Sequence, residues 1–127
     1  MEIEEMSAIR QLSPAFLAYL GDAVYELYVR TQNLLPPRRL AKYHDQVVSQ
    51  VRAETQAIYL QILMPYLTGT EKDMVRRGRN AATGKPRRLS PDLYQQATSL
   101  ETLIGYLYLH DAQRLNQLLA ILTEQSV

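Results

Sequence analysis

Apolar residues recur at intervals of three and four positions along most of the chain, as between Phe16 and Leu27. This spacing places them on one face of an α-helix, and no stretch shows the period of two typical of a β-strand. Serine followed by proline, which is typical of a helix start, precedes two of the apolar stretches, at residues 13–14 and 90–91. The predicted helices cover residues 14–32, 38–49, 50–64, 91–109 and 111–124. The pattern therefore predicts an all-α helical bundle.

Two acidic residues interrupt the apolar helical stretches. Asp22 follows Gly21 in one of them, and Glu101 lies in another. A carboxylate among packed side chains is costly unless a cation, a donor or water faces it. Mg²⁺ is a hard ion that prefers oxygen ligands, so two such carboxylates on separate helices form a candidate metal site. A hydrogen bond to a hydroxyl or an amide, such as Thr98 or Gln95, is the alternative explanation.

Glu26 is a third candidate ligand, because it lies one turn beyond Asp22 on the same face of the predicted helix. An acid in a helix is more often a solvated surface group. For Glu26 this simpler interpretation stays open.

Positive charge is concentrated between Asp73 and Asp92, although the net charge of the chain is only +1. The basic residues of this segment, which contains no acid, are Arg76, Arg77, Arg79, Lys85, Arg87 and Arg88. This asymmetry favours a polyanionic partner, although a solvated loop would have the same composition. Thr70 and Asp73 have the spacing of a capping box and predict a short helix leading into the segment. Two glycines and a proline within residues 78–90 predict a mobile loop there.

The composition limits the remaining classes of function. With 127 residues, 46% of them hydrophobic, the chain is expected to form one domain over residues 1–127, with residues 1–12 as an N-terminal segment. The absence of cysteine excludes disulfides, thiolate zinc sites and cysteine nucleophiles. No apolar run reaches the roughly 18–20 residues of a membrane span, and the acidic N-terminus does not resemble a signal peptide. We therefore expect a soluble cytoplasmic protein with no membrane partner.

Three segments resemble motifs of the ribonuclease III family. The segment from Leu20 to Glu26, LGDAVYE, resembles the family signature, in which a Leu-Gly-Asp helix carries an essential metal-binding aspartate. The segment LETLIG, which contains Glu101, resembles the second acidic motif, whose glutamate completes a Mg²⁺ site. The segment MVRRGRNA, over residues 74–81, resembles that of the Mini-ribonuclease III branch, the short bacterial form that consists of the catalytic domain only.

Three positions depart from the longer enzymes of the family. Ala15 and Ala18 stand where those enzymes have glutamates, and Thr98 stands where they have an aspartate. The Mini-ribonuclease III branch is similarly reduced, so the resemblance still implies an active enzyme. It implies that Asp22 and Glu101 are the catalytic and metal-binding residues, and it leaves the number of metal ions open.

The resemblance implies a Mg²⁺-dependent endoribonuclease with a ribonuclease III-type fold that cleaves double-stranded RNA. The substrate that it implies is the precursor of 23S ribosomal RNA, and a ribosomal protein is a further candidate partner. It also implies a two-fold homodimer, with Tyr19 and Gly21 at the interface and Tyr19 inserted into the partner subunit. The residues expected to contact RNA are Arg76, Arg77, Arg79, Asn80, Lys85, Arg87 and Arg88.

Two other classes of function fit parts of the sequence. A non-catalytic protein that binds structured RNA or the ribosome would keep the fold and the basic segment, but Asp22 and Glu101 argue against it. A helical adaptor for other proteins would leave the arginine cluster unexplained. Cleavage of duplex RNA separates the enzyme from both.

Overall fold

The computed structural model describes residues 3–83 and 88–125 and confirms the all-α fold, with no strand in this part of the chain. The helices are α1 (Ile3–Gln11), α2 (Pro14–Gln32), α3 (Leu40–Val51), α4 (Ala53–Leu63), the 3₁₀ turn η1 (Met64–Tyr66), α5 (Gly69–Ala81), α6 (Pro91–His110) and α7 (Ala112–Gln125). None of the described helices combines the length and apolarity needed to cross a membrane.

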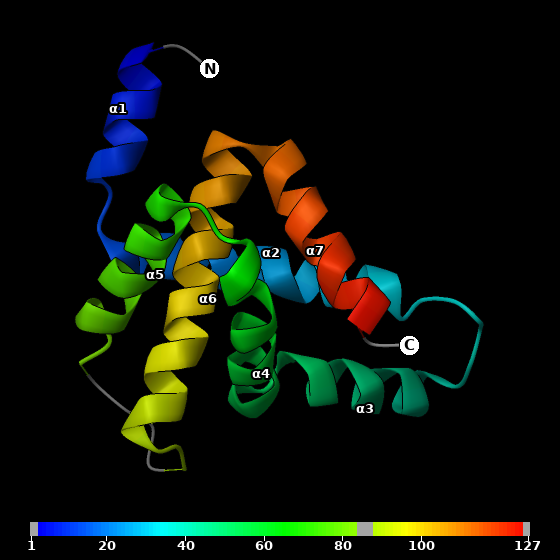
Figure 1. The fold of residues 1–127 in the computed structure, drawn as a ribbon. Helices are drawn as coiled ribbons and strands as arrows, with labels where there is room; N and C mark the ends of the chain where they lie inside the picture. Colours follow the sequence, from blue (N-terminus) through cyan, green and yellow to red (C-terminus); the bar gives the residue numbers. More distant parts are fainter. Residues whose placement is uncertain (1–2, 84–87, 126–127) are drawn as a thin grey trace.

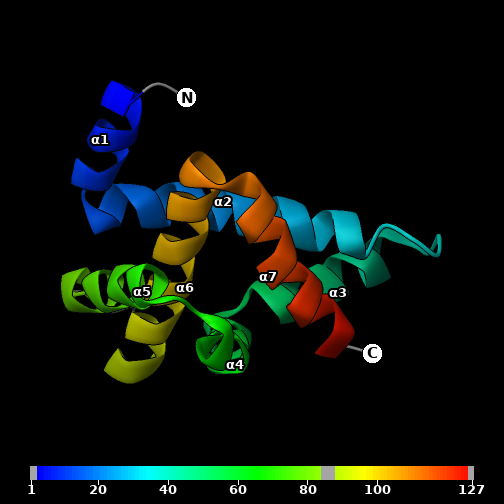
Figure 2. The same cartoon turned by 45° about the horizontal axis from the view of Figure 1, so that its top comes forward.

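Helix α6 is the centre of the fold. Figure 1 shows α2 crossing behind it, with α4 and α5 on either side, and Figure 2 shows the same crossing from another direction. An unbroken run of α6 from Thr102 to Leu107 is buried, because helices surround it on several sides. Helix α1 lies at the edge of the bundle, where the sequence predicts only an N-terminal segment.

The caps of the two long helices match the sequence signals. The Ser13 hydroxyl oxygen accepts a hydrogen bond from the Phe16 backbone N–H at 3.3 Å, and Ser90 does the same for Leu93 at 3.2 Å. Proline follows each serine as the first helical residue, where its missing N–H is not needed. Local capping chemistry therefore fixes where α2 and α6 begin.

The predicted capping box of α5 is wrong in its residues. The box consists of Thr68 and Glu71: the Glu71 carboxylate accepts from the Thr68 backbone N–H at 2.9 Å, and the Thr68 hydroxyl accepts from the Glu71 N–H at 3.2 Å. The helix then continues to Ala81. Residues 78–81 of the predicted loop are thus helical.

Apolar periodicity identifies α2 but not the face that it buries. Its buried face carries Leu17, Gly21 and Tyr25. Phe16 and Leu27 are instead 70% and 68% exposed. The helix is apolar on both sides, so one apolar strip is left uncovered in the single chain.

Candidate active site

Helices α2 and α6 cross with their backbones in contact at Gly21 and Gly105. A Cβ added to Gly21 would lie 2.7 Å from the carbonyl carbon of Glu101, and one added to Gly105 would lie 2.9 Å from that of Leu17. Both approaches are shorter than any real Cβ contact to backbone, so a larger residue at either position would force the helices apart. The crossing places Asp22, the residue after Gly21, beside Glu101.

Asp22 and Glu101, called the acid pair below, lie close enough for Asp22 to raise the pKa of Glu101. Asp22 is exposed, whereas Glu101 is partly buried. Burial first, and then the negative charge of Asp22, raise the pKa of Glu101 to about 8. Two carboxylates this close do not both ionise readily, so the pair holds a proton at neutral pH. The structure therefore brings together the two acids that the sequence singles out.

Gln56 is the residue of this site that sequence reasoning missed. It projects from α4, is only 3% exposed and acts on Glu101, whose pKa it lowers against the larger raising effects. The sequence suggests Thr98 or Gln95 as a polar neighbour of the acids, whereas the amide that acts on Glu101 belongs to Gln56 on α4. A signal was present in the sequence: Gln56 recurs with Leu60 and Leu63 at spacings of four and three on the buried face of α4.

Glu26 has an ionic partner on its own helix. Its carboxylate forms an exposed ion pair with Arg30 one turn along α2, at 3.4 Å. Within residues 3–83 and 88–125, no group of three or more histidine, aspartate or glutamate side chains is arranged to hold a metal ion. The ligand role of Glu26 stays a prediction.

The acid pair nevertheless fits a hard divalent cation. Its donors are carboxylate oxygens, which Mg²⁺ prefers, and Mg²⁺ completes its coordination with water and substrate oxygens and does not require an all-protein cage. The groups that shift the pKa of Glu101 are Asp22 and Gln56, neither of them cationic. When both carboxyl groups are ionised, a bound cation could therefore neutralise their negative charge.

Helix α5 packs against α6 close to the acid pair. A Cβ added to Gly78 would lie 2.8 Å from the Cβ of Thr102, the residue after Glu101. Glycine at this position lets the two helices approach closely. The basic segment therefore begins on a helix that is anchored beside the acid pair.

The predicted RNA-contacting residues have different surroundings. Arg79, Asn80 and Arg88 are exposed. Arg76 is exposed but forms an ion pair with Asp73. The residues predicted here that lie outside the described parts of the chain are Lys85 and Arg87.

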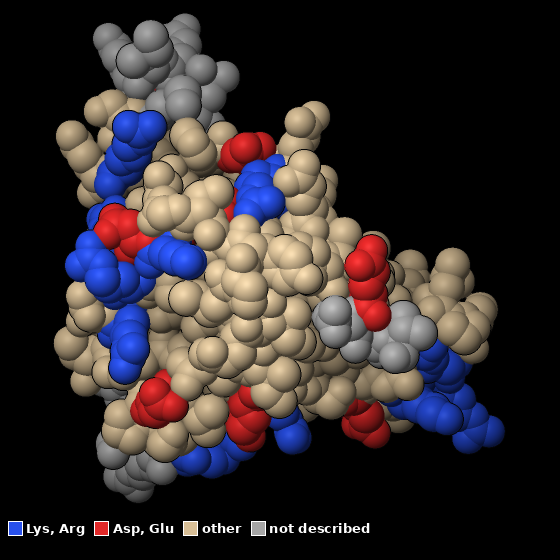
Figure 3. All heavy atoms as spheres, viewed as in Figure 1, with Lys and Arg blue, Asp and Glu red and all other residues tan. Residues whose placement is uncertain are grey.

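Arg77 has a structural contact in addition to any contact with RNA. Its side chain is half-buried and donates to the carbonyl oxygen of Leu12 at 3.5 Å, which ties α5 to the connection between α1 and α2. Figure 3 shows Lys and Arg side chains gathered over α1 and α5, with acidic side chains among them. Arg77 is therefore a poorer test of RNA binding than the freely exposed arginines.

The residues predicted at a dimer interface lie on opposite sides of α2. Tyr19 is 85% exposed and follows the same uncovered strip as Phe16 and Leu27. Gly21 is buried against α6 of its own chain, which accounts for the glycine at this position. Its interface role stays a prediction.

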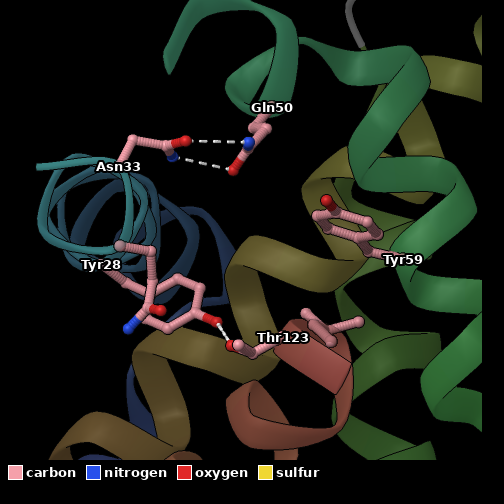
Figure 4. A pocket seen from close by; sticks show the side chains of 7 residues that line it. Tyr28, Asn33, Gln50, Tyr59 and Thr123 are labelled. Atoms are coloured by element: carbon pink, nitrogen blue, oxygen red, sulfur yellow. Dashed lines mark hydrogen bonds between the residues drawn. The ribbon is translucent and has the colours of Figure 1, made fainter. Parts of the chain in front are cut away.

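A second polar region lies at the other end of α2 and is shown in Figure 4. It is a cavity of about 190 Å³ in which the side-chain amides of Asn33 and Gln50 bond each other in both directions, at 3.1 and 3.3 Å. The Tyr28 hydroxyl donates to the carbonyl oxygen of Leu119 at 3.0 Å and also contacts Thr123. These groups satisfy one another within the chain, so they give no reason to infer a ligand.

Comparison with known proteins gives one consistent family. Residues 15–112 match the family described as Ribonuclease III domain. A protein of Synechocystis named Mini-ribonuclease 3 is 62% identical over 91% of this chain and 80% of its own length. A Synechococcus protein of the same name is 58% identical over 89% of this chain and 82% of its own length. A crystal structure of a Fusobacterium nucleatum protein, 28% identical, covers 94% of this chain and 98% of its own with a TM-score of 0.84.

Proposed function

The chain belongs to the ribonuclease III family and is an endoribonuclease, and we propose that it hydrolyses double-stranded RNA at the acid pair with the help of bound Mg²⁺. The observation that supports this proposal most directly is the convergence of Asp22 and Glu101 at the glycine crossing of α2 and α6. A partly buried pair of like charges is unfavourable in a protein that has no ligand for it. Such pairs are characteristic of functional sites.

Asp22 and Glu101 would hold the cation through their carboxylate oxygens. When bound, the ion would activate a water molecule and neutralise charge that develops on the scissile phosphate. The pKa of Glu101 is about 8, so Glu101 would have to lose its proton before both carboxylates could bind the ion. In-line hydrolysis would leave a 5′-phosphate and a 3′-hydroxyl.

The basic residues on and after α5 would contact RNA phosphates. Arg79 and Arg88 are exposed, and Gly78 anchors α5 against α6 beside the acid pair. Exposed arginines bind the phosphate backbone with little dependence on sequence, and A-form duplexes are recognised mainly by their shape. Asn80 would reach a 2′-hydroxyl, and the other members of this surface would be Arg76, Arg77, Lys85 and Arg87.

Two chains would associate through the uncovered strip of α2, which includes Phe16, Tyr19 and Leu27. A contiguous patch of exposed apolar side chains is typical of a surface that binds another protein. A two-fold pair would supply one acid pair for each strand of the duplex. Tyr19 would insert into the partner subunit.

The physiological substrate in this proposal is the precursor of 23S ribosomal RNA. The name shared by the relatives, Mini-ribonuclease 3, supports a role in RNA processing. Cleavage of a precursor transcript, with and without ribosomal proteins bound to it, tests both the substrate and the need for a protein partner. Ends that match neither mature terminus would contradict this assignment.

The decisive experiment compares wild type with Asp22→Asn and Glu101→Gln on a structured duplex RNA in Mg²⁺. Each variant keeps the size of the side chain and removes a charge, so RNA binding and folding should be retained. Cleavage should fall by roughly a hundredfold or more, because metal catalysis supplies several kcal/mol of transition-state stabilisation. Cleavage at the wild-type rate by both variants would place the active site elsewhere.

A further inference from the structure

Gln56 is a polar side chain at a position where an apolar one would pack. It is 3% exposed and lies on the same face of α4 as Leu60 and Leu63, both of which belong to the core. A buried amide loses its hydration and must recover hydrogen bonds from the protein. Methionine would fill a similar volume without this desolvation cost. The polar atoms of Gln56 therefore call for an explanation other than packing.

The amide nitrogen of Gln56 has two hydrogens to donate, and the buried amide oxygen has no hydrogen-bond partner among the described residues. One hydrogen is donated to the carbonyl oxygen of Val51, with Nε2 and the oxygen 2.8 Å apart. The side chain also acts on the carboxyl group of Glu101 and lowers its pKa, which is the effect of a donor. Because Val51 is a backbone acceptor at the end of α3, its bond fixes the amide beside that carboxyl group. Gln56 thus connects Glu101 to the junction of α3 and α4.

The hydroxyl groups near Glu101 on α6 are used differently. Ser99 and Thr102 donate to backbone carbonyls one turn back on α6, at 2.8 and 2.7 Å. The glycine crossing fixes the backbone of Glu101 but not the torsions of its side chain. Gln56 is the uncharged donor that acts on the carboxyl group itself.

We propose that Gln56 is a positioning residue that holds the Glu101 carboxyl group toward Asp22, so that both carboxylates can bind one divalent cation. The inference rests on the proposed function, because it assumes that the acid pair is the cation site. Gln56 is too deeply buried to contact RNA. It acts through Glu101, as the outer hydrogen-bond partners of metal ligands do in other proteins.

The test is Mg²⁺ binding to the RNA-free full-length chain, measured by calorimetry for wild type, Gln56→Met and Leu60→Met. Leu60→Met is the matched control, since it introduces the same side chain one turn along α4 at similar burial. Gln56→Met should bind Mg²⁺ about tenfold more weakly, the lower end of the loss seen for outer partners of metal ligands. Leu60→Met should bind as wild type does. Higher Mg²⁺ should restore cleavage by Gln56→Met, with the KM for RNA unchanged.

The outcomes separate this inference from the proposed function. If wild type binds Mg²⁺ and Asp22→Asn does not, the acid pair is the cation site. Equal Mg²⁺ affinity in wild type and Gln56→Met would then overturn the positioning role alone. Absence of Mg²⁺ binding by wild type would overturn both. If Gln56→Met does not fold, Gln56→Asn replaces it, because the shorter amide is withdrawn from Glu101 and should show the same direction of loss.

Discussion

Glu71 and Glu101 are both withdrawn from solvent, but the protein surrounds them in opposite ways. Arg114 donates from Nε and Nη2 to the two carboxylate oxygens of Glu71, at 2.9 and 3.0 Å, and these bonds hold the pKa of Glu71 below its ordinary value. Glu101 has Asp22 beside it instead, and burial together with that charge raises its pKa to about 8. Among the described residues, Glu71 is paired with a cation, whereas no cation acts on the pKa of Glu101.

This difference supports placing the proposed cation at the acid pair and not at Glu71. Glu71 already has a cationic partner in Arg114. Its carboxylate also forms half of the capping box that starts α5. In the proposed function, a divalent cation would neutralise the acid pair as Arg114 neutralises Glu71. A strongly shifted pKa at a crossing that two glycines hold closed is typical of a functional site.

The largest expected effect comes from breaking the complete pair. Arg114→Met leaves Glu71 buried without its cation, which should lower the free energy of unfolding by about 3–5 kcal/mol. Urea unfolding measures this, with Arg30→Met as the control, because the pair of Arg30 and Glu26 is exposed. The control should lose no more than about 0.5 kcal/mol. Equal losses in the two variants would remove the contrast between buried and exposed pairs.

A smaller loss of stability is expected when the crossing of α2 and α6 at Gly21 is forced apart. Gly21→Ala should cost about 2–3 kcal/mol by overpacking and should also abolish cleavage, since α2 and α6 must separate. Gly69→Ala is the matched control, because nothing lies within 4 Å of a Cβ there. Unfolding and duplex cleavage are measured on both. Full activity in Gly21→Ala would show that the acid pair does not depend on this crossing.

The two glutamates should give stability opposite dependences on pH. The pKa of Glu101 is raised from 4.5 to about 8, so the folded state binds a proton that the unfolded state has lost, and stability falls as pH rises between these values. From about pH 6.5 to about pH 8 in EDTA, the loss should be about 1–2 kcal/mol after allowance for partial exposure. The contribution of Glu71, whose pKa is lowered, is instead lost as pH falls.

Glu101→Gln identifies the source of this alkaline loss. The variant cannot ionise at this position, so its unfolding free energy should lack the decline that wild type shows. Saturating Mg²⁺ should likewise remove the decline in wild type, since the ion would bind the ionised pair. A decline that persists unchanged in Glu101→Gln would assign it to another group.

The smallest effect is expected on RNA affinity, which should depend on the basic surface and not on either glutamate. Arg79→Ala should weaken duplex binding severalfold and reduce the slope of log affinity against log salt by about one unit, while leaving Mg²⁺ affinity unchanged. Filter binding over a range of salt concentrations measures this. An unchanged slope would exclude Arg79 from the contact with RNA phosphates.

Local signals in the sequence predict the elements well. Proline after Ser13 and Ser90 marks two helix starts, and the leucines of α7 recur at the spacing that buries them. The acid pair is also predictable, because Asp22 and Glu101 interrupt apolar runs. These features depend on residues within a few turns of each other along the chain.

Features that depend on tertiary neighbours were not predictable in the same way. The exposure of Phe16 follows from which side of α2 meets α6, and periodicity does not encode that choice. The partner of Glu101 is Gln56, 45 positions earlier in the chain, brought close by the packing of α4 on α6. The capping box of Thr68 and Glu71 is different, because it has the local Thr-x-x-Glu spacing and was present in the sequence as a signal.

The most direct test of the acid pair as the cation site is Mg²⁺ binding to the RNA-free chain as a function of pH, measured by calorimetry in buffers of different ionisation enthalpy. The pKa of Glu101 near 8 predicts that affinity rises with pH up to that value, and that each ion bound at neutral pH releases about one proton. Glu101→Gln should lose both the affinity and the proton release. Binding that is independent of pH and unchanged in Glu101→Gln would contradict the account.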